Sequence, residues 1–323
     1  MLVPGFVDLQ VNGIDDVDVF CADDNGWNRL GQLLLDQGVT AWCPTLITAP
    51  LASYNETLER IVRAQSRTSS QNLPTIVGAH LEGPFLGGRP GAHQRNLIIP
   101  ADVDWLASLP DIVRLVTIAP ETTNAVQAIT SLVERGVVVS LGHSSPGADQ
   151  TEAAVAAGAT MVTHLFNAMS GVDHRRVGLA LTALTDDRLA VGLIADLVHT
   201  SAQAVQLAFR SKGSSSTVLV TDAVAWRSGR VGVIGLELRD GAPRLVDGTL
   251  AGSALTMDQA IRNVVARCGV SVEQAVRSAT SNPAAVMGRD DLGQVVAGRR
   301  ADLVALDANL AITGVWLAGA RVR

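Results

Sequence analysis

Three side chains of metal-binding type stand at equivalent places in the sequence, each in or at the end of an apolar, strand-like run. Glu82 ends the run 75–82 and is followed directly by a Gly-Pro pair, His143 ends the run 137–143, and His164 lies within the run 161–166. One carboxylate and two imidazoles would give a cation three protein ligands and leave a fourth position for water. This open pattern is typical of a catalytic zinc, whereas a structural zinc has four protein ligands.

A fourth ionisable group, Asp222, follows the strand-like run 217–221. A carboxylate beside water on a cation is suited to take a proton from that water, and the cation lowers the pKa of water to about 7. We therefore expect Asp222 to act as a general base. His93, Arg175 and His199 lie in predicted loops after other strands, where substrate contacts are usually made.

Each of these residues also has a purely structural interpretation. A single histidine at the end of a strand is more often a hydrogen-bonded core residue than a ligand, so only the combination of the four groups favours a metal site. His80 shares its strand face with Glu82, where it would either support the ligands from behind or simply pack. His174 lies in a charged turn, and we expect it to be solvated.

Other chemistries lack the residues that they need. Lys212 is the only lysine, and it lies in a Ser- and Gly-rich loop after a predicted helix. No lysine at a strand end could therefore form a Schiff base or carry a carbamate between two metals. Neither a Gly-x-Gly-x-x-Gly turn that opens a helix nor a Gly-Lys-Ser or Gly-Lys-Thr motif occurs, so nucleotide cofactors are not indicated.

The elements that must position these groups are about eight units of strand and helix. Short β-branched runs alternate with runs rich in Ala and Leu, which is typical of strands and crossover helices around a parallel sheet. The predicted strands are 3–12, 39–47, 75–82, 112–119, 137–143, 161–166, 189–195 and 217–221, and the helices between them include 27–37, 51–65, 125–135, 150–157 and 202–210. Eight such units favour an α/β fold, a closed (β/α)8 TIM-like barrel, in which the carboxyl ends of all strands meet at one mouth.

Beyond the eighth strand the pattern changes. The runs 231–238 and 244–250, linked by 239–243, predict a β-hairpin inserted into the barrel. Helices are expected at 257–268 and 272–279, and the tail 301–323 is strand-like. We therefore expect a catalytic barrel over residues 1–292, with the hairpin near 231–250, and the C-terminal strands of a small β-domain over residues 293–323.

Composition and charge limit the partners and the compartment. Of the 323 residues, 47% are hydrophobic and 17% are charged, which excludes intrinsic disorder. The formal net charge is -6 and no basic block occurs, so nucleic acid is not expected as a partner. No apolar stretch reaches the roughly 20 residues that cross a bilayer, so no membrane partner is expected. Three scattered cysteines and the lack of a leader-like start predict a cytoplasmic protein.

The sequence also contains five motifs in a familiar order. They are Pro-Gly-Phe-Val-Asp-Leu-Gln-Val-Asn-Gly at 4–13, His-Leu-Glu-Gly-Pro-Phe at 80–85, Gly-His-Ser at 142–144, Thr-His-Leu-Phe-Asn-Ala-Met at 163–169 and Gly-Ser-Ala-Leu-Thr-Met at 252–257. This set resembles the N-acetylglucosamine-6-phosphate deacetylases of the amidohydrolase superfamily, and the resemblance spans nearly the whole chain. It implies an amidohydrolase-type barrel that hydrolyses N-acetyl-D-glucosamine 6-phosphate to D-glucosamine 6-phosphate and acetate.

The resemblance implies roles for the four groups described first. Glu82, His143 and His164 would bind one divalent metal, with zinc expected before iron, cobalt or manganese. Asp222 would be the general base and later the acid for the leaving amine. His93 would polarise the acetyl carbonyl together with the metal.

Further residues would bind the sugar phosphate. The resemblance implies that Asn167 and Ala168 contact the sugar phosphate and that His199 and Arg175 hold its phosphate. Arg175 would reach the site from the neighbouring subunit, so a homodimer is implied.

Two departures from the family pattern carry expectations of their own. Relatives with a second metal carry His-x-His at the end of the first strand, where this chain has Gln10 and Asn12, neither of which is a good zinc ligand. We therefore expect a single metal. Family members also have some tens of residues before the Pro-Gly-Phe-Val-Asp motif, so we expect an N-terminally truncated β-domain whose tail 301–323 lacks partner strands.

Two other functions stay open. One is a related amidohydrolase that acts on another N-acetylhexosamine phosphate, such as the galactosamine epimer, or on another amide, because barrels of this type change substrate by changing their loops. The other is a catalytically silent sugar-phosphate-binding protein. The presence of all four groups disfavours silence, since a binding protein has no chemical need for them.

Overall fold

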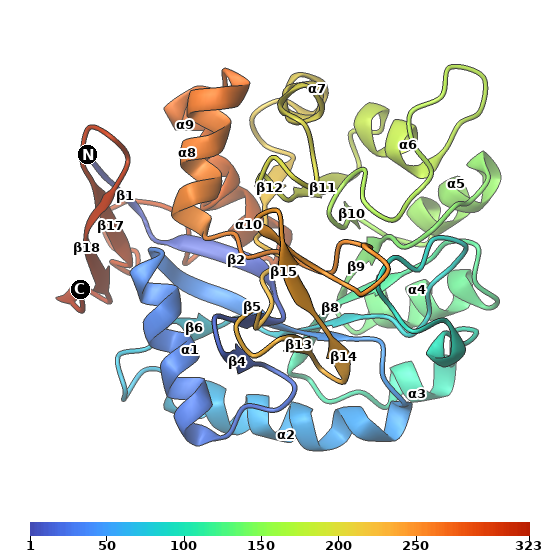
Figure 1. Cartoon of the computed structure of the whole chain (residues 1–323), viewed down its shortest axis with the longest axis horizontal. Helices are drawn as coiled ribbons and strands as arrows, with labels where there is room; N and C mark the ends of the chain where they lie inside the picture. The colour runs from blue at the N-terminus through green and yellow to red at the C-terminus, as the bar shows by residue number, and fades with distance from the viewer.

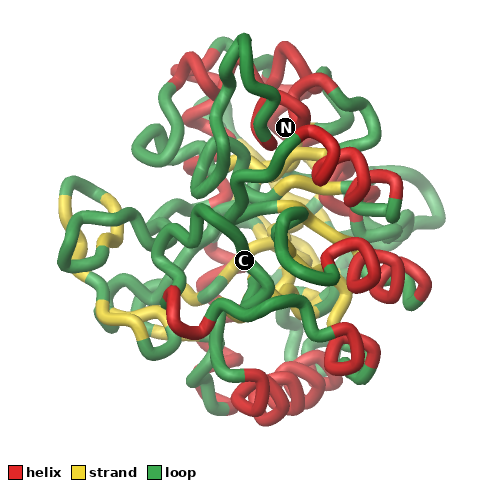
Figure 2. The backbone as a smooth tube through the Cα atoms, turned by 90° about the vertical axis from the view of Figure 1, so that its right-hand side faces the viewer, coloured by secondary structure: helices red, strands yellow, loops and turns green.

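The computed structural model describes residues 1–323, and eight parallel strands form a barrel at its centre (Figures 1 and 2). In order around the wall they are β12 (Thr217–Leu219), β11 (Ala190–Leu193), β10 (Met161–Val162), β9 (Val138–Leu141), β8 (Val113–Ile118), β7 (Ala79–Glu82), β5 (Val39–Ile47) and β2 (Phe6–Val11). Each consecutive pair in this order is parallel. The short strand β6 (Thr75–Ile76) also pairs with β5. The predicted TIM-like barrel is therefore confirmed.

The seam between β2 and β12 is the one place in the wall without a continuous backbone ladder. A single parallel bridge joins Val11 to Ala223 at the mouth. Deeper in the wall, the Asp8 carboxylate accepts hydrogen bonds from the hydroxyl and the N–H of Thr221, at 2.6 and 3.3 Å. A buried side chain thus joins the two strands, directly below Asp222.

Helices surround the barrel and cover the outer faces of its strands (Figure 2). They are α1 (Asp24–Asp36), α2 (Leu51–Arg67), α3 (Val103–Ala107), α4 (Ala125–Glu134), α5 (Ala148–Ala156), α6 (Leu179–Thr185), α7 (Ala202–Lys212), α8 (Met257–Cys268), α9 (Val272–Ser278) and α10 (Ser281–Val286), with a 3-10 turn η1 (Arg95–Leu97). Sequence patterns did not predict α3, α6 and α10, which have five, seven and six residues and so offer at most two turns of periodicity. None of the helices has both the length and the apolar character needed to cross a bilayer.

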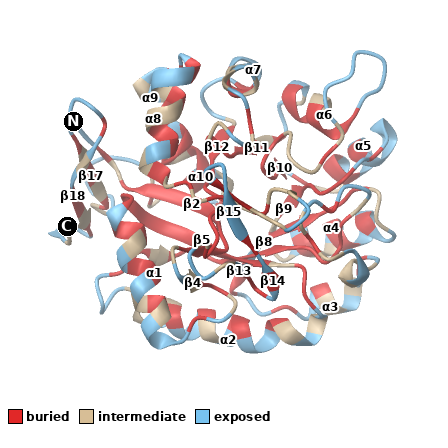
Figure 3. Cartoon of the chain, viewed as in Figure 1, coloured by how far each residue is buried: buried red, intermediate tan, exposed pale blue.

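Burial on both faces explains why the strand sequences are nearly continuous runs of apolar residues. All six residues of β2 and eight of the nine in β5 are buried, since one strand face lines the barrel and the other packs against helices. Figure 3 shows the same contrast, with buried strands inside and exposed outer faces on the helices. Apolar residues of the barrel, the helices and the small sheet belong to one contiguous core.

A separate four-stranded antiparallel sheet contains both ends of the chain (Figure 1). Its order is β1 (Leu2–Pro4), β17 (Leu303–Leu306), β18 (Ile312–Leu317) and β19 (Ala320–Arg321). The expectation that the tail lacks a partner strand is therefore wrong for β17, which pairs with β1. The predicted strand 3–12 divides at Gly5, where a side chain would lie 2.0 Å from the Thr40 hydroxyl oxygen. The chain passes here from the small sheet into the barrel.

The inserted segment after β12 differs from the predicted hairpin. It forms two small antiparallel ribbons, β13 (Arg230–Val231) with β14 (Ile234–Gly235) and β15 (Glu237–Arg239) with β16 (Ala242–Arg244). The predicted five-residue linker 239–243 is wrong. Asp240 and Gly241 both have positive φ, at 51° and 77°, so the chain turns within these two residues. Pro243 therefore lies in a strand, opposite Leu238. Another short ribbon, β3 (Gly13–Ile14) with β4 (Val17–Asp18), follows β2.

Candidate active site

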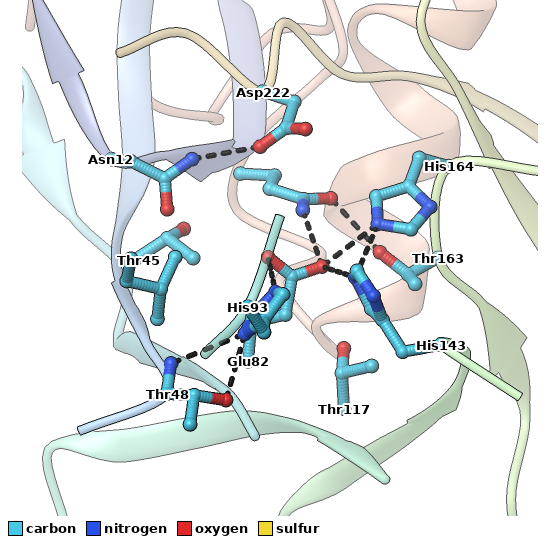
Figure 4. Close-up of polar contacts among 12 residues, drawn as sticks. Asn12, Thr45, Thr48, Glu82, His93, Thr117, His143, Thr163, His164 and Asp222 are labelled. Atoms are coloured by element: carbon cyan, nitrogen blue, oxygen red, sulfur yellow. Dashed lines mark hydrogen bonds and ion pairs between the residues drawn. The ribbon is translucent and has the colours of Figure 1, made fainter. Parts of the chain in front are cut away.

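The carboxyl ends of four barrel strands bring the predicted chemical groups together. Glu82 is the last residue of β7, His143 and His164 follow β9 and β10 by two residues, and Asp222 follows β12 by three. All four side chains are buried, with at most 8% of each residue exposed. Figure 4 shows the four groups facing a common point. The mouth of the barrel therefore holds the charged cluster that the sequence predicts.

Three candidate ligand atoms converge within hydrogen-bonding distance. Glu82 Oε1 lies 3.1 Å from His143 Nε2 and 2.9 Å from His164 Nε2, and the two nitrogens are 3.0 Å apart. Ligands that are about 2.0 to 2.1 Å from a tetrahedral zinc lie about 3.3 Å from one another. The spacing of the three atoms is therefore close to that of a shared cation.

The protonation of His143 also fits a metal ligand. Its Nδ1 donates a hydrogen bond to the Pro90 carbonyl over 3.0 Å, which leaves the lone pair on Nε2. Burial lowers the pKa of His143 to about 4, so the ring is neutral at pH 7. Burial would raise the pKa of Glu82, but its contacts with the neighbouring histidines, His143 foremost, hold it well below its usual range. A nitrogen lone pair thus faces a carboxylate, and such a pair needs a cation between its members.

His93 reaches the same cluster but as a different tautomer. Nitrogens of His93 and His143 and an oxygen of Glu82 all lie within 4.8 Å of one another. The Thr48 N–H donates to His93 Nδ1 over 3.3 Å, and the Thr48 hydroxyl lies 2.7 Å from the same nitrogen. The proton of the neutral ring therefore sits on Nε2, which is 3.7 Å from Glu82 Oε2. His93 can donate a hydrogen bond into the site, whereas His143 and His164 can bind a metal.

Asp222 stands opposite the cluster and is held by Asn12. Asn12 Nδ2 donates to Asp222 Oδ1 over 2.7 Å, which leaves Oδ2 free. Burial, and then the charge of Glu82, raise the pKa of Asp222 to about 7. A carboxylate with this pKa can accept a proton and return it near neutrality.

Gln10 contacts the Glu82 carboxylate as a donor. Its Nε2 donates to Glu82 Oε1 over 2.9 Å, and its Oε1 accepts from the Thr163 hydroxyl over 3.0 Å. Gln10 and Asn12 thus each donate to a carboxylate of the site. Gln10 thus presents no oxygen to the Glu82 cluster, whereas Asn12 Oδ1 is buried without a hydrogen-bond partner.

Several site residues adopt backbone conformations that non-glycine residues seldom take. His143, Ala168 and Asp222 have φ of 49°, 48° and 49°. Such left-handed conformations are strained and persist only where neighbouring contacts hold them, most often at functional sites. Here they turn the chain at a strand end so that the side chain faces the mouth.

A cavity of about 250 Å³ opens above the cluster and has two kinds of wall. Asn167, Ala168 and His199 line it on loops after β10 and β11. Asp196 accepts from His199 Nδ1 over 2.6 Å and so orients that ring. An apolar wall lies on the insertion and the end of β5, formed by Ile47, Val224, Val231, Ile234, Leu250 and Ala251.

Arg175 is not brought to this cavity within the chain. It lies in an exposed segment between β10 and α6, where its N–H donates to Asp173. His174 is exposed in the same segment, as expected. His80 is buried behind Glu82 and lies 2.8 Å from the Thr117 hydroxyl oxygen, so it packs below the site.

Some residues that shape the site were not found from the sequence. Thr48 sets the tautomer of His93 although the two are 45 positions apart, and Glu121 contacts the loop that carries His143. Nothing in the local sequence distinguishes these two residues from ordinary polar residues of loops. Asp196 could have been found, because a carboxylate often orients a histidine ring and Asp196 lies only three positions before His199.

Comparisons with known proteins agree with this geometry. The signature of the amidohydrolase family matches residues 1–322. The bovine N-acetylglucosamine-6-phosphate deacetylase is 38% identical over 99% of this chain and 82% of its own length. An Escherichia coli O157:H7 protein, named N-acetylgalactosamine-6-phosphate deacetylase, is 35% identical over 99% of this chain and 87% of its own.

Solved structures match over the same extent. The N-acetylglucosamine-6-phosphate deacetylase of Thermotoga maritima superposes with a TM-score of 0.92 at 30% identity, covering all of this chain and 88% of that one. A mutant of the Mycobacterium smegmatis enzyme, solved with N-acetyl-D-glucosamine-6-phosphate, superposes with a TM-score of 0.91 at 36% identity, covering 99% and 86%. The chain therefore belongs to the amidohydrolase family and groups within it with the N-acetylglucosamine-6-phosphate deacetylases.

Proposed function

We propose that this protein is a metal-dependent deacetylase that hydrolyses N-acetyl-D-glucosamine 6-phosphate to D-glucosamine 6-phosphate and acetate. The observation that carries the proposal is the convergence of Glu82, His143 and His164 within 3.1 Å of one another, opposite a buried Asp222. The relatives named for this reaction match the chain from end to end. Such a reaction takes place in amino-sugar breakdown and recycling.

The three ligands would hold a single divalent cation, with zinc first because imidazole and carboxylate ligands suit it, and with iron, cobalt or manganese as alternatives. When bound, the cation supplies Lewis acidity for a carbonyl oxygen and makes water easier to deprotonate. Gln10 and Asn12 direct N–H groups at the two carboxylates. These contacts support one metal rather than two.

The remaining residues move protons and stabilise charge. Asp222 Oδ2 takes a proton from the attacking water and delivers it to the nitrogen of the departing amine. His93 donates from Nε2 to the acetyl oxygen, on which negative charge develops as water adds. Asn12 keeps Asp222 in place through Oδ1 during both transfers.

The substrate would lie across the cavity from its polar wall to its apolar wall. Asn167, Ala168 and His199 would contact the sugar phosphate, and the apolar wall would enclose the acetyl methyl. Arg175 of the partner subunit would complete the phosphate site in a homodimer, which agrees with its exposed position on a loop away from its own cavity. A phosphorylated sugar substrate and three free cysteines support a cytoplasmic location for this reaction.

We also propose that the catalytic unit lies within residues 1–292 and that residues 293–323 form a small β-domain, to which β1 at the start of the chain contributes a strand. A second substrate is favoured by one comparison. The 35% identity to a protein named for the galactosamine epimer makes N-acetyl-D-galactosamine 6-phosphate the alternative.

Acetate release tests the function directly. Purified protein is assayed on both sugar epimers, each with and without the 6-phosphate, before and after chelation, and bound metal is measured by mass spectrometry. We expect release from N-acetyl-D-glucosamine 6-phosphate to be fastest, to disappear on complete metal removal and to return with zinc. Full activity in the metal-free protein would refute the proposal. Binding of the sugar phosphate without turnover by the metal-loaded protein would favour a silent binding protein instead.

A further inference from the structure

Glu121 lies outside the cavity, yet its carboxylate connects two of the loops that form the site. It follows β8 and precedes α4. Oε1 accepts hydrogen bonds from the N–H groups of Gly88 and Ser145, at 3.0 and 2.7 Å, and Oε2 accepts from the Ser144 hydroxyl at 2.7 Å. All three donors are uncharged, so the carboxylate serves here as an acceptor for loop groups rather than as half of an ion pair.

The first of these loops follows β7 and carries His93. It also approaches His143 directly, since the Gly87 N–H donates to the His143 carbonyl over 2.9 Å and the Pro90 carbonyl accepts from the His143 ring. A side chain at Gly87 would place its Cβ 2.0 Å from Glu121 Oε1. The backbone of this loop therefore passes directly against the Glu121 carboxylate.

The second loop follows β9 and carries His143, and it continues the connection to a third. Ser144, fully buried, donates its N–H to the Ala168 carbonyl over 3.0 Å and accepts from the Ser170 N–H over 3.1 Å. Ala168 lies on the loop after β10, beyond His164. A single carboxylate thus fixes Ser144, and Ser144 in turn joins the loops of two candidate metal ligands.

Strain at two of these positions explains why such a connection is needed. His143 and Ala168 both hold left-handed φ angles, which the chain adopts only under the constraint of surrounding contacts. Two of the three residues that donate hydrogen bonds to Glu121, Ser144 and Ser145, directly follow His143 in the sequence. Loss of their contacts would let His143 relax toward ordinary φ and turn its Nε2 away from Glu82.

We propose that Glu121 is a positioning residue that holds His143, and through the first loop His93, in the geometry needed for metal binding and turnover. This role rests on the proposed metal-dependent deacetylation. It predicts that removing the carboxylate weakens metal binding even though Glu121 touches neither metal nor substrate. Residues that orient metal ligands typically change metal affinity or activity by about 10- to 100-fold when removed.

Four variants test the role. Glu121→Ala removes all three acceptor contacts, Ser144→Ala removes one of them, and Glu121→Gln keeps an oxygen for the two N–H groups and offers its amide to the Ser144 hydroxyl. Glu152→Gln is the matched control, because Glu152 is exposed and pairs only with Arg188.

Zinc affinity is measured by competition with a chromophoric chelator, and ligand geometry by the visible absorption of the Co2+-substituted protein. Hydrogen exchange of segments 87–89 and 144–146 is followed in the metal-free protein.

We expect Glu121→Ala to weaken zinc binding by about 10- to 100-fold, to change the cobalt spectrum and to speed exchange in both segments. Its kcat should fall more than its KM rises. Ser144→Ala should show a smaller effect of the same kind, and Glu121→Gln should recover most of the affinity. Glu152→Gln should match the wild type.

Other outcomes separate the two proposals. A Glu121→Ala variant with wild-type zinc affinity and cobalt spectrum would overturn the positioning role and leave the deacetylase function intact. If that variant does not fold, wild-type zinc affinity and a wild-type cobalt spectrum in Ser144→Ala would overturn the role equally. A wild-type protein that neither binds metal nor releases acetate would instead overturn the proposed function itself.

Discussion

Gln10 donates from Nε2 to Glu82 Oε1 over 2.9 Å, and this is the oxygen that faces both His143 and His164. The strand β2 therefore reaches the candidate metal site through a neutral donor rather than through a ligand. The opposite end of the same amide accepts from Thr163. The Gln10 side-chain amide is thus hydrogen-bonded through both its nitrogen and its oxygen, and it fixes the orientation of the Glu82 carboxylate.

Replacing Gln10 by Leu should weaken zinc binding by about 10-fold, because Glu82 loses the donor that orients it. Chelator competition measures the change. Gln127→Leu, on the exposed face of α4, provides the matched control. Unchanged affinity in Gln10→Leu would mean that the histidines alone orient the carboxylate.

Asp222→Asn should lower kcat by about 100- to 10,000-fold, since an amide cannot accept the proton of water. Zinc content and the affinity for the substrate should stay near wild type, because Asp222 does not contact the three ligand atoms. Steady-state kinetics and metal analysis of the same sample measure both. A loss of less than 10-fold would show that another group accepts the proton.

His93→Gln tests the assignment of its tautomer. If Nε2–H donates to the developing oxyanion, kcat should fall by about 100- to 1,000-fold while the protein keeps one zinc. Thr48→Val should reduce kcat less, because the Thr48 N–H still contacts Nδ1. Loss of zinc from His93→Gln would instead make His93 a ligand.

The position of Arg175 can be tested by complementation. Arg175→Ala and Asp222→Asn should each be nearly inactive alone. A mixed dimer would contain one site with an intact Asp222 and an intact Arg175 from the partner subunit. Co-expression of the two variants should therefore restore about a quarter of the wild-type activity. No restoration would show that Arg175 does not complete a site across an interface.

Asp8 should make stability depend on pH. Burial raises its pKa to about 7, above the 3.8 expected for an unfolded aspartate. Between these values the folded state holds a proton that the unfolded state releases, so the free energy of unfolding falls as pH rises from about 4 to 7, by at most about 4 kcal/mol. Below pH 4 the stabilisation is complete, and above pH 7 it is lost.

Asp8→Asn imitates the protonated carboxyl and should remove this part of the pH dependence. Urea unfolding of both proteins at several pH values isolates the contribution of Asp8. Parallel stability curves for the two proteins between pH 4 and 7 would rule out the raised pKa.

The barrel and its charged cluster could be predicted because both follow from strong local patterns. Apolar runs mark the strands, and Glu82 and His143 stand where such runs stop. The tautomer of His93 could not be predicted, since it depends on Thr48, which follows the distant strand β5. The transfer of residues 2–4 to the small sheet depends on contact between Gly5 and Thr40, and the sequence alone does not show this contact. Tertiary packing, rather than local preference, decides such features.

The seam between β2 and β12 has a consequence for how the molecule responds to heat. A wall that is continuous elsewhere is joined here by one backbone bridge and by the side-chain hydrogen bonds of Asp8 and Asn12. On warming, we expect the barrel wall to open first at the seam between β2 and β12. This opening would separate Asp222, which follows β12, from Asn12, which follows β2. Turnover would then fade on warming while the surrounding helices are still folded, so loss of activity would report a local loosening rather than global melting.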